Sequence, residues 1–180
     1  MYVGITGTFA AGKGEVVRIL KAKGFKHYGF GDLLRERVNA AGKNPDVPTT
    51  TAFANELRLK HGPDYLAKEL LHKLEREAPE DAVLESIRTL GELNALRKLP
   101  GFLLVSIDAP REIRYERLQG RGRRDNLNTF EEFCHWEDKQ LEGKGHEQQL
   151  LAVMDEADIQ LVNIGNLEEL REQVEENLNI

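Results

Sequence analysis

Two glycines and a lysine near the N-terminus have the spacing of a phosphate-binding loop. Gly7 to Lys13 fits the pattern G-x-x-x-x-G-K, between a short apolar run and a stretch with helical periodicity. Glycines let the backbone fold around an anion with N–H groups pointing inward, and the N-terminus of the following helix adds about half a positive charge. Lys13 can then reach the outer phosphates. We therefore predict a nucleotide site formed by Gly7, Thr8, Phe9, Ala10, Ala11, Gly12, Lys13, Gly14 and Glu15.

The two residues after Lys13 are unusual for such a loop. Gly14 stands where a Ser or Thr hydroxyl normally binds magnesium, so Mg²⁺ must be held in another way. Glu15 suits the positive end of the helix dipole. It would, however, face a nucleotide phosphate unless its side chain turns outward.

Length and composition indicate one soluble domain spanning residues 1–180. The chain has 180 residues, 40% of them hydrophobic, which is enough to bury about 70% of the unfolded surface. The net charge of −6 argues against a nucleic-acid partner and leaves small anionic molecules possible. Cys134 is the only cysteine, which excludes a disulfide framework and a thiolate metal site. Because a strand pattern begins at once, we expect no leader segment. We also expect no membrane segment, a cytoplasmic location, and a monomer or homodimer.

Short β-rich runs alternate with helical patterns along the whole chain, which is typical of α/β proteins. The strands are predicted at 2–5, 26–29, 82–85, 102–108 and 159–163. The helices are predicted at 12–22, 32–41, 51–60, 65–77, 90–99, 112–119, 130–141 and 167–178. Right-handed crossovers then give three layers, with a five-stranded parallel sheet covered by helices on both faces and ligands beyond the carboxyl ends of the strands. Residues 42–51, with two prolines and three threonines, are predicted to be a mobile loop.

The second predicted strand ends in residues that could bind an anion. Gly31 frees the turn, and Asp32 can cap the following helix. Arg35 lies one turn into that helix, where its guanidinium could bind a phosphate or carboxylate through two hydrogen bonds. The alternative for Arg35 is a solvated surface arginine.

The third predicted strand ends in Glu85, followed within one turn by Arg88. Phosphate-loop enzymes usually keep an acid at this position for magnesium and its waters, so Glu85 is our candidate for the metal. Arg88 would share an anion with Arg35 and thereby form a second anion site. The alternative is that Glu85 is an ordinary loop residue.

The fourth predicted strand leads into the one cationic cluster of an acidic chain, interrupted by Gly120 and Gly122. Phosphoryl transfer needs positive charge placed beside the transferring group, and it needs water to be excluded. Arginines on a closable lid supply both. The alternative is that they only complement a helix dipole. The arginines are Arg114, Arg117, Arg121, Arg123 and Arg124.

Three further groups are interpreted as structural. The five histidines show no ligand spacing with acids or cysteine. Phe130, Phe133 and Trp136 lie at helical spacing on one face, as expected for packing residues. Residues 131–142 form mostly a solvated acidic face, although Glu137 and Asp138 near the lid could approach a metal.

Four motifs, in order, resemble those of adenylate kinase and its relatives: Gly7 to Gly14, Gly31 to Arg35, Arg88, and Glu116 to Arg121. Nearly the whole chain also resembles an archaeal-type family of adenylate-kinase-related, dephospho-CoA-kinase-like proteins. The shared features are the Gly-Lys-Gly-Glu loop, Leu57-Arg58 with Gly62-Pro63-Asp64, Arg121 to Asp125, and Ala157-Asp158 followed by Asn163 and Gly165. The resemblance implies a nucleoside-monophosphate-kinase fold with a helical acceptor-binding insertion at about 32–80 and a short lid at about 117–130.

The resemblance also implies roles for single residues, with ATP and Mg²⁺ as cofactors. Lys13 would bind the β- and γ-phosphates, and Arg117 and Arg121 the donor nucleotide, whose base Asn163 and Gly165 would border. The acceptor would be bound by Gly31, Asp32, Arg35, Arg58, Arg88 and Arg124. Adenylate kinases also carry glycine after the lysine and hold magnesium largely through water. The chain departs from the adenylate-kinase pattern in three respects: Phe30 in place of Thr or Ser, Glu85-Ser86 in place of Asp-Gly, and a short lid with no zinc cysteines.

The activity expected from these features is transfer of the ATP γ-phosphoryl group to a small phosphorylated acceptor, with a nucleoside monophosphate favoured. Lys13, Arg88, Arg117 and Arg121 are the expected catalytic residues. A dephospho-CoA-type kinase stays open, as does a nucleotide-responsive ATPase or switch, for which Arg35, Arg58 and Arg88 would be idle. An RNA-associated factor is disfavoured by the net charge.

Overall fold

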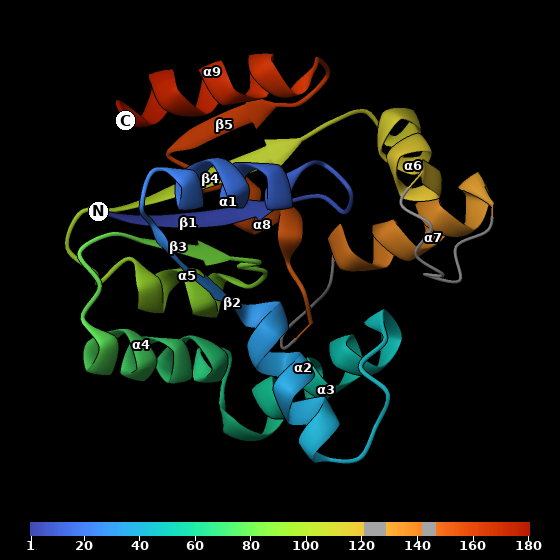
Figure 1. Cartoon of the computed structure of the whole chain (residues 1–180). Helices are drawn as coiled ribbons and strands as arrows, with labels where there is room; N and C mark the ends of the chain where they lie inside the picture. The colour runs from blue at the N-terminus through green and yellow to red at the C-terminus, as the bar shows by residue number, and fades with distance from the viewer. Residues whose placement is uncertain (121–128, 142–146) are drawn as a thin grey trace.

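The computed structural model describes residues 1–120, 129–141 and 147–180, and the strands in these segments form a single parallel sheet. Its order is β2-β3-β1-β4-β5, so the phosphate loop follows the central strand (Figure 1). The strands are β1 (Tyr2–Gly7), β2 (Lys26–Gly29), β3 (Ala82–Glu85), β4 (Phe102–Asp108) and β5 (Ile159–Val162). All five strand predictions are confirmed, within two residues at each end.

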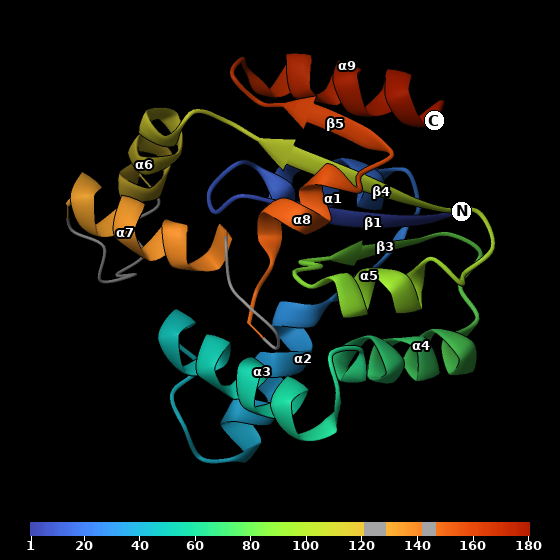
Figure 2. The same cartoon turned by 180° about the vertical axis from the view of Figure 1, so that it is seen from behind.

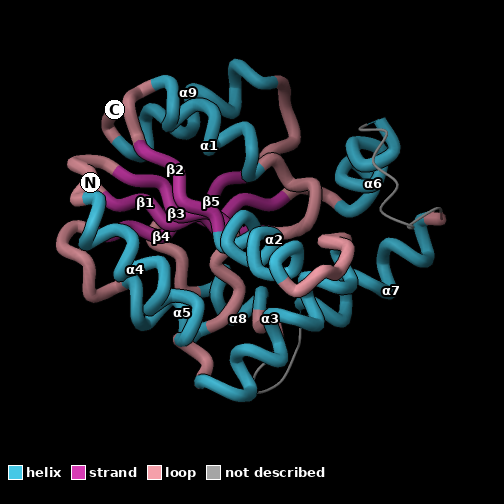
Figure 3. The backbone as a smooth tube through the Cα atoms, turned by 60° about the horizontal axis from the view of Figure 1, so that its bottom comes forward, coloured by secondary structure: helices cyan, strands magenta, loops and turns pink. Residues whose placement is uncertain are grey.

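Helices cover both faces of the sheet, which confirms the predicted three-layer fold. One face carries α1 (Lys13–Ala22) and α9 (Leu167–Leu178), and the other carries α4 (Tyr65–Glu77), α5 (Leu90–Leu96) and α8 (Leu150–Asp155) (Figures 1 and 2). Figure 3 shows the strands between these two layers. The remaining described helices are α2 (Phe30–Ala40), α3 (Val47–His61), α6 (Arg111–Gly120) and α7 (Phe130–Leu141).

The two-residue period of the strands divides the core into two clusters. Val83 and Val105 pack with α1 and α9, whereas their chain neighbours Leu84 and Leu104 pack with α4 and α5. These four side chains are at most 1% exposed. Successive side chains of a strand point to opposite faces, so strands that are apolar at both positions need cover on both sides.

Three local predictions were wrong. Val47–Thr51 belongs to α3 rather than to a loop, because Asp46 caps that helix by accepting a hydrogen bond from the Thr49 N–H at 2.8 Å. Asp32 does not cap α2, which begins at Phe30 without a side-chain cap. The six-residue helix α8 was not predicted, since so short a segment shows little periodicity.

The strand register brings the candidate residues to one edge of the sheet. Glu85 is level with Gly29 on one side and Ile5 on the other, and Asp108 is level with Val162. The loop after β1 therefore lies between the ends of β3 and β4. Within the described parts of the chain, every helix is too short or too polar to cross a membrane.

Candidate active site

The loop after β1 has a backbone shape that requires glycine at two positions. Gly7 and Gly12 have φ angles of 138° and 116°, in the region that favours glycine. A Cβ on Gly7 would lie 2.0 Å from the carbonyl oxygen of Ile107, and one on Gly12 would lie 2.4 Å from Asn163 Nδ2. Lys13 turns back over this loop, with Nζ donating to the carbonyls of Gly7 at 2.9 Å and Thr8 at 2.7 Å.

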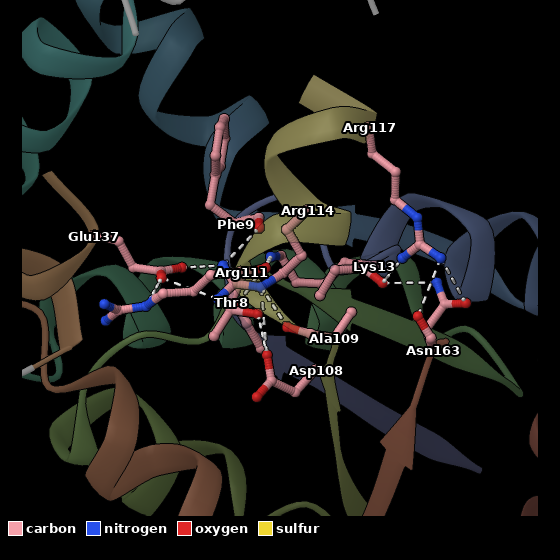
Figure 4. Close-up of polar contacts among 12 residues, drawn as sticks. Thr8, Phe9, Lys13, Asp108, Ala109, Arg111, Arg114, Arg117, Glu137 and Asn163 are labelled. Carbon is pink, nitrogen blue, oxygen red and sulfur yellow. Dashed lines mark hydrogen bonds and ion pairs between the residues drawn. The ribbon is translucent and has the colours of Figure 1, made fainter. Parts of the chain in front are cut away.

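Contacts from β4, α6 and α7 hold the loop in place (Figure 4). The Thr8 hydroxyl donates to Asp108 Oδ1, and Arg114 Nη1 donates to the carbonyl of Phe9 at 3.2 Å. Arg114 also forms an ion pair with Glu137, and both side chains are at most 3% exposed. The expectations that Arg114 belongs to the lid and that Glu137 lies on a solvated face were wrong. A buried carboxylate needs partners of opposite charge, and Arg114 and Arg111 are those partners.

Arg117 and Asn163 meet on the donor side of the loop. Arg117 Nη2 donates to the Asn163 carbonyl at 3.0 Å, and Asn163 Nδ2 donates to the Ala11 carbonyl at 2.7 Å. Asn163 is 6% exposed, and Gly165 lies in the bend before α9. The other lid residues of the prediction, Arg121 and Arg124, lie outside the described residues, as does Arg123. Most of the predicted lid is therefore untested.

One cleft of about 590 Å³ joins the phosphate loop to α2, α3, the end of β3, and α7. The continuity matters because a phosphoryl donor and its acceptor must meet in one space. Most of the predicted loop and acceptor residues line this cleft: Phe9, Ala10, Gly12, Lys13, Gly14, Glu15, Gly31, Asp32, Arg35, Arg58, Glu85 and Arg88.

Glu85 lies in this cleft in contact with a histidine. His27 Nε2 is 3.0 Å from Glu85 Oε2, and His27 Nδ1 is 3.9 Å from Asp32 Oδ2. No pattern in the sequence indicated this pairing, which arises because His27 and Glu85 lie two register positions apart on the neighbouring strands β2 and β3. Among the described residues, no three His, Cys, Asp or Glu side chains could together hold a metal. Glu85 with water and phosphate oxygens is the arrangement that fits Mg²⁺ here.

Four arginines were predicted to bind the acceptor, and the three that lie within the described residues differ in their partners. Arg58 Nη2 lies 2.7 Å from Glu92 Oε1 in a pair that is at most 2% exposed. Arg35 Nη2 lies 2.5 Å from Asp32 Oδ1 in an exposed pair. Arg88 donates instead to two glutamines, Gln140 and Gln148. The arginines of the acceptor end are therefore not equivalent.

Sequence reasoning missed two kinds of residue at this end. Glu92 caps α5 in a capping box with Thr89, and its Oε2 also accepts the N–H of Arg88 at 2.9 Å. The Thr-x-x-Glu spacing was the signal that could have found it. Gln140 and Gln148 had no such signal. Trp136, predicted to be a packing residue, packs edge-on against Phe9 with the ring centroids 4.9 Å apart, and it also lines the cleft.

The fold and the phosphate loop together define a P-loop kinase fold, and residues 3–142 match the family model described as an AAA domain. The chain belongs to the UPF0200 protein family. It is 34% identical over 173 residues to the UPF0200 protein of Methanoculleus marisnigri, covering 96% of this chain and 92% of that protein. The corresponding values for the Methanosarcina mazei relative are 30% over 180 residues, 98% and 93%.

The likeness to solved structures concerns the fold alone. Shikimate kinase from Bacteroides thetaiotaomicron superposes with a TM-score of 0.67 at 14% identity, covering 100% of this chain and 99% of that one. These comparisons support a P-loop kinase fold and nucleotide binding. The resemblance to adenylate kinase and to dephospho-CoA kinase remains a prediction.

Proposed function

We propose that the protein is an ATP-dependent phosphotransferase that moves the γ-phosphoryl group to a small phosphorylated acceptor, with a nucleoside monophosphate as the favoured class. The observation that carries this proposal is the single cleft that contains both Lys13 and Arg88. A nucleotide on the loop would direct its terminal phosphate into this cleft. Arg88 at the other side would hold an anionic acceptor.

Five basic side chains line the cleft against three acidic ones, which favours anionic ligands in an otherwise acidic protein. The basic residues are Lys13, Arg18, Arg35, Arg58 and Arg88, and the acidic ones are Glu15, Asp32 and Glu85. Glu15 faces Arg18 in an ion pair, so part of its charge is compensated.

Magnesium would neutralise charge that develops on the β- and γ-phosphates. Gly14 offers no hydroxyl to the ion, and a Cβ there would meet nothing within 4 Å. Glu85 is therefore our candidate to hold the ion through water. His27 holds one Glu85 oxygen and so orients the carboxylate. Lys13 would bind the phosphates from the loop side. An acceptor that is already anionic needs no general base beyond Asp32.

The test is to measure ADP release from Mg-ATP with and without single acceptors: nucleoside monophosphates, their deoxy forms, and dephospho-CoA. Acceptor-dependent ADP release supports the proposal and identifies the acceptor class, including the dephospho-CoA alternative. Lys13→Ala should lower turnover by about 10³-fold, because Lys13 stabilises charge on the transferring group. Lys21→Ala, an exposed lysine of the same helix, is the matched control and should behave as wild type.

A nucleotide-responsive ATPase or switch is the second candidate. It is favoured by the ion pairs of Arg35 and Arg58, which occupy two of the three acceptor arginines that the structure describes. The contacts of Thr8 and Phe9 with Asp108 and Arg114 would carry a change at the loop to α6 and α7. Slow ADP release at one rate, whatever acceptor is added, would support this candidate and overturn the transferase.

A further inference from the structure

Arg88 is held by two glutamine side chains from distant parts of the chain. Its Nη1 donates to Gln140 Oε1 at 3.0 Å and to Gln148 Oε1 at 2.7 Å. Its backbone is fixed as well, since its N–H donates to Glu92 and its carbonyl accepts from the N–H of Gln149, both at 2.9 Å. The guanidinium is therefore preorganised in the wall of the cleft.

These contacts determine how both amides are oriented. A guanidinium only donates hydrogen bonds, so each glutamine must turn its carbonyl oxygen toward Arg88 and its NH2 group away. Gln140 and Gln148 are 6% and 5% exposed, and both line the cleft. Within residues 1–120, 129–141 and 147–180, neither NH2 group has a hydrogen-bond partner, and neither do Nε and Nη2 of Arg88. All three residues line the cleft, so these donors are available to a ligand with acceptor oxygens.

Arg88 also differs electrostatically from its neighbours. Arg35 and Arg58 each have a carboxylate partner, whereas Arg88 has neutral amides and no carboxylate at ion-pair distance among the described residues. Burial lowers the pKa of the Arg88 guanidinium, and nearby Arg58 lowers it further, while Glu92 and Glu85 act in the opposite direction. An anion at Arg88 would offset this cost of burying a charge.

We propose that Arg88, Gln140 and Gln148 form a phosphate-recognition subsite for the acceptor, in which the two glutamine NH2 groups determine specificity. This inference rests on the proposed function and deepens it. A phosphate monoester has three terminal oxygens, which can accept from all three side chains. A carboxylate has only two oxygens in one plane and leaves donors unpaired. The subsite therefore selects a phosphate over a carboxylate.

The test measures phosphate binding while the loop is filled by a non-hydrolysable ATP analogue. Trp136, the only tryptophan, lines the cleft and reports binding by its fluorescence. The probes are inorganic phosphate, nucleoside monophosphates, and acetate as the planar carboxylate. Gln140→Met and Gln148→Met remove the NH2 donors together with the Oε1 acceptors for Arg88, at nearly constant side-chain length, whereas Gln148→Glu keeps an acceptor for Arg88. Gln160→Met, an exposed glutamine of β5, is the matched control.

Each of the two methionine variants should weaken the binding of phosphate and of a nucleoside monophosphate about 10- to 100-fold, the effect of losing hydrogen bonds to a charged group. The KM for the acceptor should rise by a similar factor, while the Kd of ATP stays within about twofold of wild type. Gln148→Glu keeps an oxygen for Arg88 but adds a negative charge, so it should weaken phosphate binding more than Gln148→Met does.

The outcomes separate this inference from the proposed function. Unchanged phosphate binding in both methionine variants, acetate binding as tight as phosphate binding, or no fluorescence response in wild type would overturn the subsite. Acceptor-dependent ADP release with wild-type KM in both variants leaves the transferase standing without the subsite. Glutamine-dependent phosphate binding with no acceptor-dependent ADP release leaves the subsite standing without the transferase.

Discussion

The phosphate loop at the donor end of the cleft is one short segment, whereas the acceptor end is built from five distant ones. Gly7 to Glu15 forms the donor loop by its backbone shape, with Gly7 and Gly12 in conformations that other residues rarely adopt. The acceptor end combines α2, α3, the turn after β3, the end of α7, and Gln148. Its shape depends on side-chain pairs, such as Arg58 with Glu92 and Arg88 with two glutamines. A local motif thus indicates where a nucleotide binds, whereas the acceptor site depends on long-range contacts.

Breaking the buried pair of the acceptor end should have the largest effect. Glu92→Ala leaves the Arg58 guanidinium buried without a carboxylate and removes the Glu92 half of the capping box of α5, so we expect a loss of about 3–5 kcal/mol in the free energy of unfolding. Urea denaturation measures this loss. Glu168→Ala breaks an exposed pair with Arg171 and serves as the control, with a change below about 1 kcal/mol. A similarly small change in Glu92→Ala would contradict the view that this pair holds the acceptor end together.

Arg88→Ala should lower turnover with the acceptor about 10²- to 10³-fold, or some 3–4 kcal/mol, because one preorganised cation is lost from the transferring group. The Kd of ATP should stay near that of wild type, since Lys13 lies on the loop. Steady-state kinetics with the best acceptor, together with ATP titration, measure both quantities. Unchanged turnover would remove Arg88 from the site.

Gly12→Ala tests whether the phosphate loop at the donor end needs the backbone conformation that glycine allows. The new Cβ would displace the Asn163 amide, and alanine at a φ of 116° is strained, so we expect a loss of about 1–3 kcal/mol in stability. Gly14→Ala is the matched comparison, since its Cβ has open space in a helix that favours alanine, and stability should not fall. Equal thermal stability of the two variants would show that backbone shape does not restrict position 12.

The smallest effect is expected at Asp46, which caps α3 beside the acceptor end. The Thr49 hydroxyl and then its N–H lower the pKa of Asp46. A lowered pKa in the folded state means that Asp46 adds stability above the unfolded value of about 3.9, and that this is lost as pH falls through the folded-state pKa. The stability difference between wild type and Asp46→Asn should therefore shrink between about pH 7 and pH 3. A difference in melting temperature that is independent of pH would contradict this role.

The fold followed from the sequence because each strand and most helices show their own periodicity. Residues 102–108 and 65–77 were predicted with the bounds that β4 and α4 have in the structure. Two predictions of secondary structure failed for local reasons. Asp46 caps a helix within a segment whose threonines and prolines indicated a loop, and α8 is too short to show a pattern. Asp32 had the right residue type for a cap but lies in the first turn of α2, where it pairs with Arg35.

At the site, the loop residues and the presence of Glu85 and Arg88 in one cleft were predictable, because the carboxyl ends of parallel strands meet at one edge. The interaction partners of the charged side chains were not predictable. Arg114 was expected on a lid and instead binds Glu137 and the loop, and no pattern in the sequence indicated that His27 lies against Glu85. A charged side chain shows its type in the sequence, but its partner is determined by which distant segments the fold brings together.

The sequence by itself determined the class of fold, the phosphate loop, and the strand ends at which charged residues gather. These features depend on local backbone preferences and on the period of apolar residues. Both can be recognised from residues that are close together in the sequence. Only the tertiary structure decided that Arg58 is held by Glu92 while Arg88 meets Gln140 and Gln148. The physical reason is that a charge removed from water needs polar partners, and these lie 34 residues away for Arg58 and 52 and 60 residues away for Arg88.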